Sequence, residues 1–177
     1  MSLIITASGL AYEVHAGQTY GDQPYTVHLE AAVAVLHRFG FVLSAEAEAL
    51  LAAAWLHDSV EDTDLETEDI RREVSPQVAA LVGAVTNEPG RNRQERNART
   101  YPNIRATPDA VIVKLADRIA NVEASWASQD ARLFMYHREY RGFRQALRDT
   151  ASVSDGFAER AGRMWDHLDK LLGYWER

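Results

Sequence analysis

Four side chains that bind metals or transfer protons lie close together in this chain. They are His57, Asp58, Glu61 and Asp62, and the stretch that precedes them is apolar. Imidazoles and carboxylates are the groups that proteins use both as ligands for divalent ions and as acids and bases. The chemistry that this run indicates is therefore metal binding combined with proton transfer.

A single helix, from about residue 45 to about residue 62, is expected to carry this run. Ser44 is a favourable N-cap, acidic residues occupy the first turn, and the apolar stretch in the middle favours burial. The spacing of the four reactive residues must therefore be considered on a helical surface.

Residues four apart share one face of a helix, so His57 is expected over Glu61 and Asp58 over Asp62. Burying three carboxylates and an imidazole together is costly unless a cation neutralises them. An acidic helix end in water would also explain Glu61 and Asp62. It explains His57 and Asp58 less well, because they directly follow apolar residues.

A second polar stripe lies farther along the chain, on another apolar segment. Thr107 and Pro108 supply an N-cap and a first-turn proline, so a helix is expected to begin there. Lys114, Asp117 and Asn121 follow at steps of three and four and share a face. Such a stripe needs a partner, although an ion pair of Asp117 with the arginine beside it is a simpler explanation.

With both segments in view, the chain resembles the HD-domain superfamily. More narrowly, it is similar to the hydrolase domain of the RelA/SpoT family, which removes the 3′-pyrophosphate from guanosine tetraphosphate and pentaphosphate. The blocks that carry the resemblance are His15-Ala-Gly-Gln18 with Pro24-Tyr25-Thr26-Val27-His28, similar to HxGQ and PYxxH; His57-Asp58-Ser-Val-Glu61-Asp62-Thr63, which matches HDxxEDT; and Lys114-Leu-Ala-Asp117-Arg118-Ile-Ala-Asn121, similar to KLADRxxN. They span about residues 12 to 125, in the family's order and at close to its spacing.

The resemblance implies roles for individual residues. It implies four ligands of a divalent metal, with manganese the usual ion: His28, His57, Asp58 and Asp117. Glu61 and Asp62 would position and deprotonate the attacking water, while Lys114 and Asn121 would lie at the nucleotide, Asn121 nearest the ribose. The chemistry agrees, because two imidazoles and two carboxylates leave positions on an ion for water and a phosphate oxygen.

One segment departs from the family. Between Gln18 and Pro24 the family carries an Arg-Lys pair whose arginine packs on the guanine, and this chain has Thr19-Tyr20-Gly21-Asp22-Gln23 instead. Tyr20 would supply a stacking surface for any base, at about 1–3 kcal/mol. A half-buried loop tyrosine is the alternative. The departure bears on the guanine preference more than on the phosphate chemistry.

A cluster of arginines precedes the second helix. Its members are Arg91, Arg93, Arg96, Arg99 and Arg105. Their charge could receive the substrate's phosphates at the mouth of the site, most plausibly through Arg96 or Arg99. A solvated helix face, offset in part by Glu95, is the favoured interpretation.

Composition limits the class of protein. The chain has 177 residues, a net charge of −7 and no cysteine. We expect one HD phosphohydrolase domain over residues 1–177, located in the cytoplasm, with a nucleotide as its partner and neither nucleic acid nor membrane. A homo-oligomer is compatible with the sequence.

The other segments also favour helices. Further helices are expected over about 24–39, 67–74, 75–85, 130–148 and 157–175, and no segment alternates as a strand does. The expected fold is all-α, an HD-domain helical bundle with its C-terminal helices over about 130–175. A surface position or core packing is the favoured interpretation of His37, His137 and His167, whereas His15 opens a family-like block and could brace the site.

Three functions are compatible with these patterns. The leading one is a metal-dependent pyrophosphohydrolase that acts on guanosine tetraphosphate, guanosine pentaphosphate or a related nucleotide. The second is an HD-type nucleotidase that acts on other nucleotides, which the missing Arg-Lys pair favours. The third is a nucleotide-binding sensor without turnover, and the intact Glu61 and Asp62 argue against it.

Overall fold

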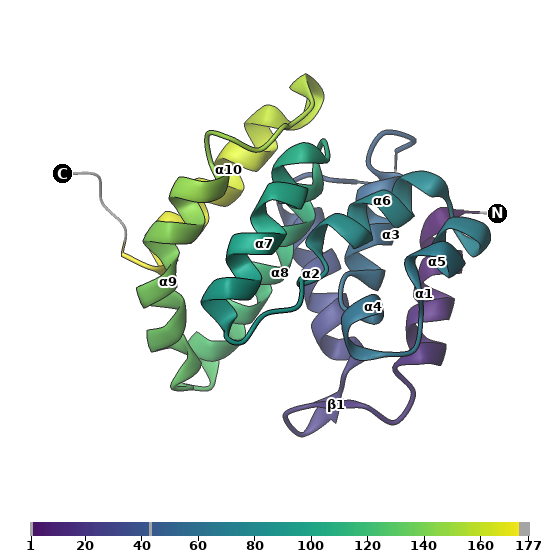
Figure 1. The fold of residues 1–177 in the computed structure, drawn as a ribbon, viewed down its shortest axis with the longest axis horizontal. Coiled ribbons are helices and arrows are strands. Elements are labelled where there is room, and N and C mark those ends of the chain that lie inside the picture. Colours follow the sequence, from purple (N-terminus) through teal and green to yellow (C-terminus); the bar gives the residue numbers. More distant parts are fainter. Residues whose placement is uncertain (1, 43, 174–177) are drawn as a thin grey trace.

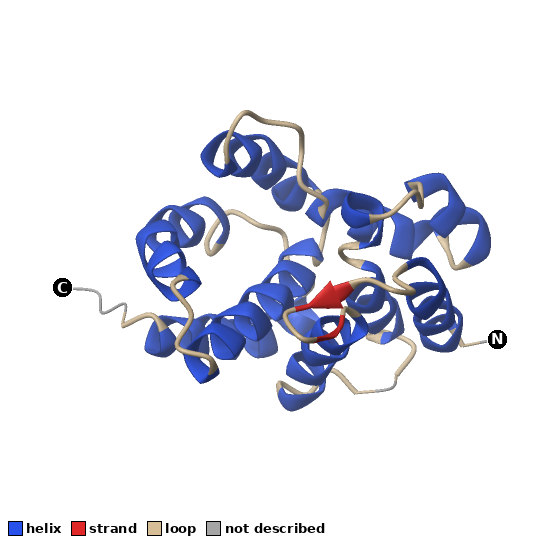
Figure 2. Ribbon diagram, turned by 90° about the horizontal axis from the view of Figure 1, so that it is seen from below, coloured by secondary structure: helices blue, strands red, loops and turns tan. Residues whose placement is uncertain are grey.

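The computed structural model describes residues 2–42 and 44–173, and this part of the chain is built from helices (Figure 1). In chain order they are α1 Leu3–Val14, α2 Thr26–Arg38, α3 Glu48–Leu56, α4 Ser59–Asp62, α5 Thr67–Glu73, α6 Pro76–Val85, α7 Arg93–Ala106, α8 Ala110–Ala127, α9 Arg132–Leu147 and α10 Asp155–Leu171. The prediction of an all-α fold is confirmed. Within the described residues, strands are limited to an antiparallel hairpin of β1 Thr19–Tyr20 and β2 Gln23–Pro24, which lies beside α2 (Figure 2).

Helix α3 lies at the centre of the N-terminal half of the fold. It packs against α1, α2, α6 and α8. Its middle is the run Ala52, Ala53 and Ala54, and all three side chains are fully buried. Because alanine has a short side chain, the neighbouring helices approach α3 closely and lock its C-terminal end in place. That end leads directly into His57 and Asp58.

The prediction of one helix over about 45–62 is wrong. Helix α3 begins later, at Glu48, and ends at Leu56, and α4 is a separate short helix. His57 and Asp58 lie in the turn between them. The tertiary contacts of these two side chains, described below, override the continuous helix that local preference favours. The stacking of His57 over Glu61 that the single helix implied is therefore lost.

Helix α8 also begins later than predicted. Thr107 ends α7, and Asp109 precedes the first turn of α8 in a left-handed conformation with φ 66°. The carboxylate of Asp109 accepts hydrogen bonds from the backbone N–H and the hydroxyl of Ser154, at 2.7 and 2.6 Å. These bonds hold a backbone conformation that is unusual for a residue with a side chain.

The other predicted helices are confirmed to within a few residues, except at some ends. The helix predicted for 67–74 begins at Thr67, after a capping box of Glu66 and Asp69. The last helix starts at Asp155, two residues before its predicted start, and its predicted end at 175 falls outside the described residues. Helix α1 was not predicted, and α7 had been considered only as a solvated face. None of the described helices has the length and apolarity needed to cross a membrane.

Helices α9 and α10 form a second layer against α8, at the opposite side of the molecule from α1 (Figure 1). Between α8 and α9 lies the buried guanidinium of Arg118, which sits over the rings of Tyr136 and Phe143 at 5.1 and 4.6 Å. Cation–π contacts of this kind partly replace the water that a buried cation loses. The C-terminal layer thus determines where one cation of α8 lies.

We expect Leu51→Ala in α3 to destabilise the protein by about 2–5 kcal/mol, because the Leu51 side chain is fully buried and its removal leaves a cavity in the core. Ile5→Ala in α1 is the matched control, since Ile5 is 67% exposed, and should change the free energy of unfolding by less than about 0.5 kcal/mol. Urea unfolding of both variants measures the difference. Equal losses in the two would contradict the central position of α3.

Candidate active site

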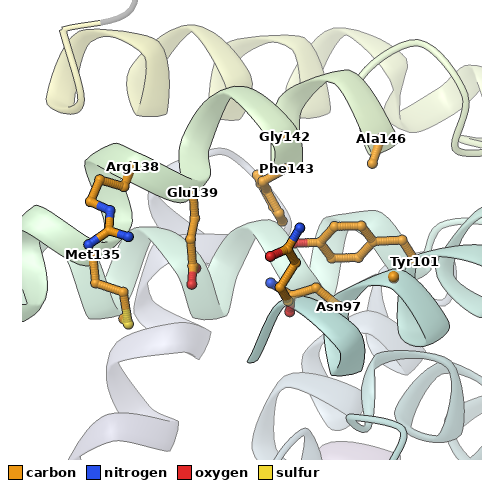
Figure 3. Close-up of a pocket in the computed structure, with 10 residues that line it drawn as sticks. Asn97, Tyr101, Met135, Arg138, Glu139, Gly142, Phe143 and Ala146 are labelled. Atoms are coloured by element: carbon orange, nitrogen blue, oxygen red, sulfur yellow. The ribbon is translucent and has the colours of Figure 1, made fainter. Parts of the chain in front are cut away.

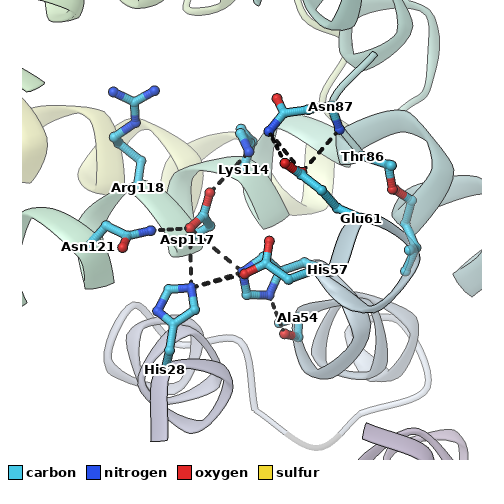
Figure 4. A network of polar contacts seen from close by, with 12 residues as sticks. His28, Ala54, His57, Glu61, Thr86, Asn87, Lys114, Asp117, Arg118 and Asn121 are labelled. Atoms are coloured by element: carbon cyan, nitrogen blue, oxygen red, sulfur yellow. Dashed lines mark hydrogen bonds and ion pairs between the residues drawn. The ribbon is translucent and has the colours of Figure 1, made fainter. Parts of the chain in front are cut away.

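Three elements bring four ligand-type side chains to one point (Figure 4). His28 lies in the first turn of α2, His57 and Asp58 lie in the turn after α3, and Asp117 lies in the middle of α8. Both imidazoles are almost fully buried, at 4% and 2% exposed. Residues that are far apart in the sequence therefore share one buried location, as the resemblance implied.

The donor atoms converge within a small radius. Nε2 of His57 lies 3.2 Å from Nε2 of His28, 3.1 Å from Oδ2 of Asp58 and 3.6 Å from Oδ1 of Asp117. Nε2 of His28 lies 3.4 and 3.5 Å from the same two carboxylate oxygens. His28, His57 and Asp58 offer ligand atoms that all lie within 4.8 Å of one another, and Asp117 approaches both imidazoles from α8.

This geometry fits a divalent ion. Ligand bonds of about 2.0–2.2 Å with tetrahedral or octahedral angles place neighbouring donor atoms about 2.8–3.6 Å apart. The imidazole–imidazole distance and the distances from the imidazoles to Asp58 and Asp117 fall in that range. The spacing of these donor atoms thus suits a metal ion.

The tautomer of His57 suits a ligand. Its Nδ1 lies 2.8 Å from the backbone carbonyl oxygen of Ala54. A carbonyl only accepts, so Nδ1 carries a proton, and Nε2 is the ring nitrogen that faces the cluster and would present its lone pair to a metal once deprotonated. The last turn of α3 thereby orients the imidazole.

In the cluster, the carboxylates and the imidazoles shift one another's pKa values. Burial alone would lower the pKa of His57, but the carboxylates of Asp58 and Asp117 outweigh it and raise that pKa well above its usual range. Burial would raise the pKa of Asp58, but the two imidazoles outweigh it and hold that pKa well below its usual range. The two carboxylates therefore stay ionised and require a positive partner, and bound protons or a metal ion can fill that need.

Glu61 and Asp62 are held by different neighbours, at the edge of the cluster. The side-chain amide of Asn87 donates to both carboxylate oxygens of Glu61, at 3.0 and 2.8 Å. The hydroxyl of Tyr25 lies 2.7 Å from Oδ2 of Asp62 and 2.8 Å from Oδ2 of Asp58, between the two carboxylates. Burial and these carboxylates raise the pKa of Tyr25 well above its usual range, so it remains a donor.

Sequence reasoning missed the part that Asn87 plays. It follows α6 outside every motif, and its position gave no signal. Tyr25 was contained in the PYxxH-like block but was not singled out.

His15 braces the site, as its place in the first block indicated. Its Nε2 lies 3.1 Å from the hydroxyl oxygen of Ser59, and its Nδ1 lies 2.7 Å from Oε1 of Gln18. Its ring stacks on Tyr25 with centroids 4.7 Å apart. Gln18 in turn donates to the backbone oxygen of Asp62 at 2.8 Å. The first block thus fixes the turn and the short helix that carry the second.

The residues assigned to the nucleotide surround Asp117. The ammonium of Lys114 lies 3.1 Å from Oδ2 of Asp117, and the amide of Asn121 donates to Oδ1 of the same carboxylate. The hydroxyl of Tyr20 donates to the side-chain oxygen of Asn121 at 2.9 Å. Its ring stacks on His28 at 5.0 Å, and the guanidinium of Arg132 lies over it at 5.3 Å. A base that stacks on Tyr20 would compete with Arg132.

A pocket of about 370 Å³ joins these groups. All the predicted site residues except His57 line it: Tyr20, His28, Asp58, Glu61, Asp62, Lys114, Asp117 and Asn121. Three arginines line it as well, and they come from α7, α8 and α9: Arg93, Arg118 and Arg132. Of the basic segment it is therefore Arg93, rather than Arg96 or Arg99, that faces the site. Arg99 instead donates to the backbone oxygen of Pro89.

The chain is similar to several proteins that are named as 3′-pyrophosphohydrolases. A probable guanosine-3′,5′-bis(diphosphate) 3′-pyrophosphohydrolase of Synechocystis is 33% identical over 128 residues, 68% of this chain and 16% of that protein. The guanosine-3′,5′-bis(diphosphate) 3′-pyrophosphohydrolase MESH1 of Drosophila melanogaster is 40% identical over 86 residues, 46% of this chain and 48% of that protein. The corresponding pyrophosphohydrolase of Aquifex aeolicus is 32% identical over 171 residues, 91% of this chain and 22% of that protein. The chain thus spans less than half the length of these relatives.

The fold itself has a solved counterpart. A structure of a metazoan ortholog of SpoT, described as hydrolysing ppGpp, aligns with a TM-score of 0.71 and 23% identity, and the alignment covers 94% of this chain and 96% of that one. At that identity the likeness concerns the fold. A family model described as HD domain matches residues 7–141, which include all three motif blocks and the four ligand-type side chains. This chain belongs to the HD domain family.

Proposed function

We propose that the protein is a metal-dependent phosphohydrolase that removes the 3′-pyrophosphate from guanosine tetraphosphate, guanosine pentaphosphate or a related nucleotide. The observation that carries the proposal is the convergence of four ligand-type side chains beside a pocket that also holds a carboxylate pair and several cations. The relatives that are named as pyrophosphohydrolases support the choice of substrate.

His28, His57, Asp58 and Asp117 are the proposed ligands. When bound there, a divalent ion would lower the pKa of a water molecule and polarise a phosphate oxygen. The mixed nitrogen and oxygen donors suit manganese, which is the ion that we propose, and also suit iron, zinc and nickel.

The chain's own residues supply proton transfer and charge. Glu61 accepts hydrogen bonds on both carboxylate oxygens from Asn87, which hold the carboxylate in place. It is the proposed base, with Asp62 as its partner in positioning the water. Lys114 and the three arginines would offset the phosphate charge, and Asn121, held by Tyr20, would contact the ribose.

A second candidate is an HD-type nucleotidase that acts on other nucleotides. The hairpin lacks the Arg-Lys pair, and its Tyr20 is engaged by His28 and Arg132, so the part of the fold that binds guanine in the family differs here. A manganese-supplemented screen distinguishes the candidates. Purified protein is assayed against guanosine tetraphosphate, other 3′-phosphorylated nucleotides and ordinary nucleotides, and the products are separated by chromatography. Failure to release pyrophosphate from any 3′-pyrophosphorylated nucleotide would rule out the leading proposal.

We expect His57→Ala and Asp117→Asn to lose most of the bound metal, because each removes a donor from the cluster. Metal content after dialysis, measured by mass spectrometry, tests this. His37→Ala and Asp149→Asn change the same residue types at exposed positions outside the pocket and should bind as the parent does. Full occupancy in both cluster variants would refute the assignment.

We expect Glu61→Gln and Asp62→Asn to keep the metal and to lose turnover by a factor on the order of 10²–10⁴, the usual contribution of a positioned acid or base. Initial rates and metal content are measured on the same samples. Asp64→Asn is the control, since Asp64 is exposed and lies outside the pocket. Rates within twofold of the parent in both variants would remove this pair from the mechanism.

A further inference from the structure

A second pocket, of about 580 Å³, lies between α7 and α9 (Figure 3). The residues that carry the argument are Asn97, Ala98 and Tyr101 from α7, and Met135, Gly142 and Phe143 from α9. A volume of this size falls within the range of about 300–1,000 Å³ that is typical of small-molecule sites. No predicted site residue lines this pocket.

The second pocket adjoins the candidate active site. Asn97 and Met135 line both of them, so the two spaces are neighbours. A ligand that extends past these two side chains would place one part beside the metal cluster and another part between α7 and α9.

The aromatic and amide part of the second pocket's lining suits a planar group with polar edges. Tyr101 and Phe143 form an aromatic floor with ring centroids 6.0 Å apart, and Met135 adds a polarisable thioether. Gln94 and Asn97 present side-chain amides, which pair with the hydrogen-bonding edges of a nucleobase.

Charged side chains at the boundary of the two pockets determine which end of such a ligand lies in which pocket. Oε2 of Glu139, which lines the second pocket, lies 2.9 Å from Nε of Arg93 and 3.6 Å from Nη1 of Arg118. Both arginines line the active-site pocket. The second pocket is lined by one cation and one anion, Arg138 and Glu139, which offset each other, whereas Lys114 and three arginines line the active-site pocket. The phosphates are therefore favoured beside the metal cluster.

We infer that the pocket between α7 and α9 holds the nucleobase of the substrate, while its phosphates lie at the cluster of His28, His57, Asp58 and Asp117. The inference rests on the proposed function, since it takes the substrate to be a nucleotide. It also accounts for the altered hairpin, because Tyr20 is already stacked on His28 and covered by Arg132.

Recognition by side-chain amides has a consequence for specificity. An amide offers a donor and an acceptor and can turn to meet either purine. The base preference between guanosine and adenosine 3′-pyrophosphates is therefore expected to stay below roughly tenfold, about 1.4 kcal/mol.

Filling the second pocket tests the inference. A Cβ added at Gly142 meets nothing within 4 Å, so Gly142→Leu should fold and place its side chain in the open space. Ala98→Leu narrows the pocket from the opposite wall, at an exposed position. We expect each variant to raise KM for guanosine tetraphosphate at least tenfold with little change in kcat. Neither should change KM for the same ribose phosphates without a base. Gly142→Ala, which adds one carbon, is the matched control and should behave as the parent.

Binding of guanosine 3′,5′-bisphosphate, measured by calorimetry, gives a readout that does not need turnover. Both leucine variants should bind it at least tenfold more weakly than the parent, and circular dichroism should show the parent's helix content. An unchanged KM and an unchanged affinity in both leucine variants would overturn the inference and leave the proposed hydrolase intact. An equal loss for the substrate without a base would also overturn it. A parent protein that neither hydrolyses nor binds these nucleotides would contradict both proposals.

Discussion

The buried carboxylate of Asp117 and the half-buried carboxylate of Asp58 face two buried imidazoles, and this arrangement imposes the main constraint on the structure. Asp58 and Asp117 stay ionised because the imidazoles and Lys114 lie close to them, and each imidazole is held near both carboxylates. Such an arrangement is costly to bury, and it persists only if the surrounding packing determines it firmly. The helices around α3 supply that packing, since small side chains at its centre let them approach closely. The geometry of the cluster therefore depends on the packing of the core around α3.

Most of the reactive groups lie at or near helix ends, and Asp117, in the middle of α8, is the exception. Helix α3 ends at Leu56, directly before His57 and Asp58. A continuous helix would have placed His57 over Glu61. With the break, His57 and Asp58 lie beside His28, and the carboxylate of Glu61 accepts hydrogen bonds from Asn87. Ligand-type and base-type carboxylates that are adjacent in sequence therefore receive different partners. That separation allows one to bind a metal while another accepts a proton.

Much of this arrangement could be predicted from the sequence, and the reasons differ for its parts. The polar stripes stood out because they interrupt apolar helices, and the structure brings them to one pocket. The break after Leu56 could not be foreseen, because local preference favours a helix and only tertiary contacts oppose it. Asn87 was missed, and Arg93 was not singled out within its arginine cluster, for a related reason. An asparagine after a helix and an arginine in a basic run are common, and their importance depends on which face of the fold they reach.

In the proposed arrangement, helix α9 borders both the pocket that would hold the phosphates and the pocket that would hold the base. Arg118 comes from the same helix as Asp117, but its guanidinium points away from the cluster toward aromatic rings and a carboxylate of α9 (Figure 4). Glu139 lies between the two pockets, since it lines one and pairs with two arginines of the other. Under the proposals above, a change in α9 would alter which nucleotide fits without altering a metal ligand, because none of the four proposed ligands lies on α9. Metal chemistry and nucleotide selectivity would then lie on different helices, and either could vary while the other is preserved.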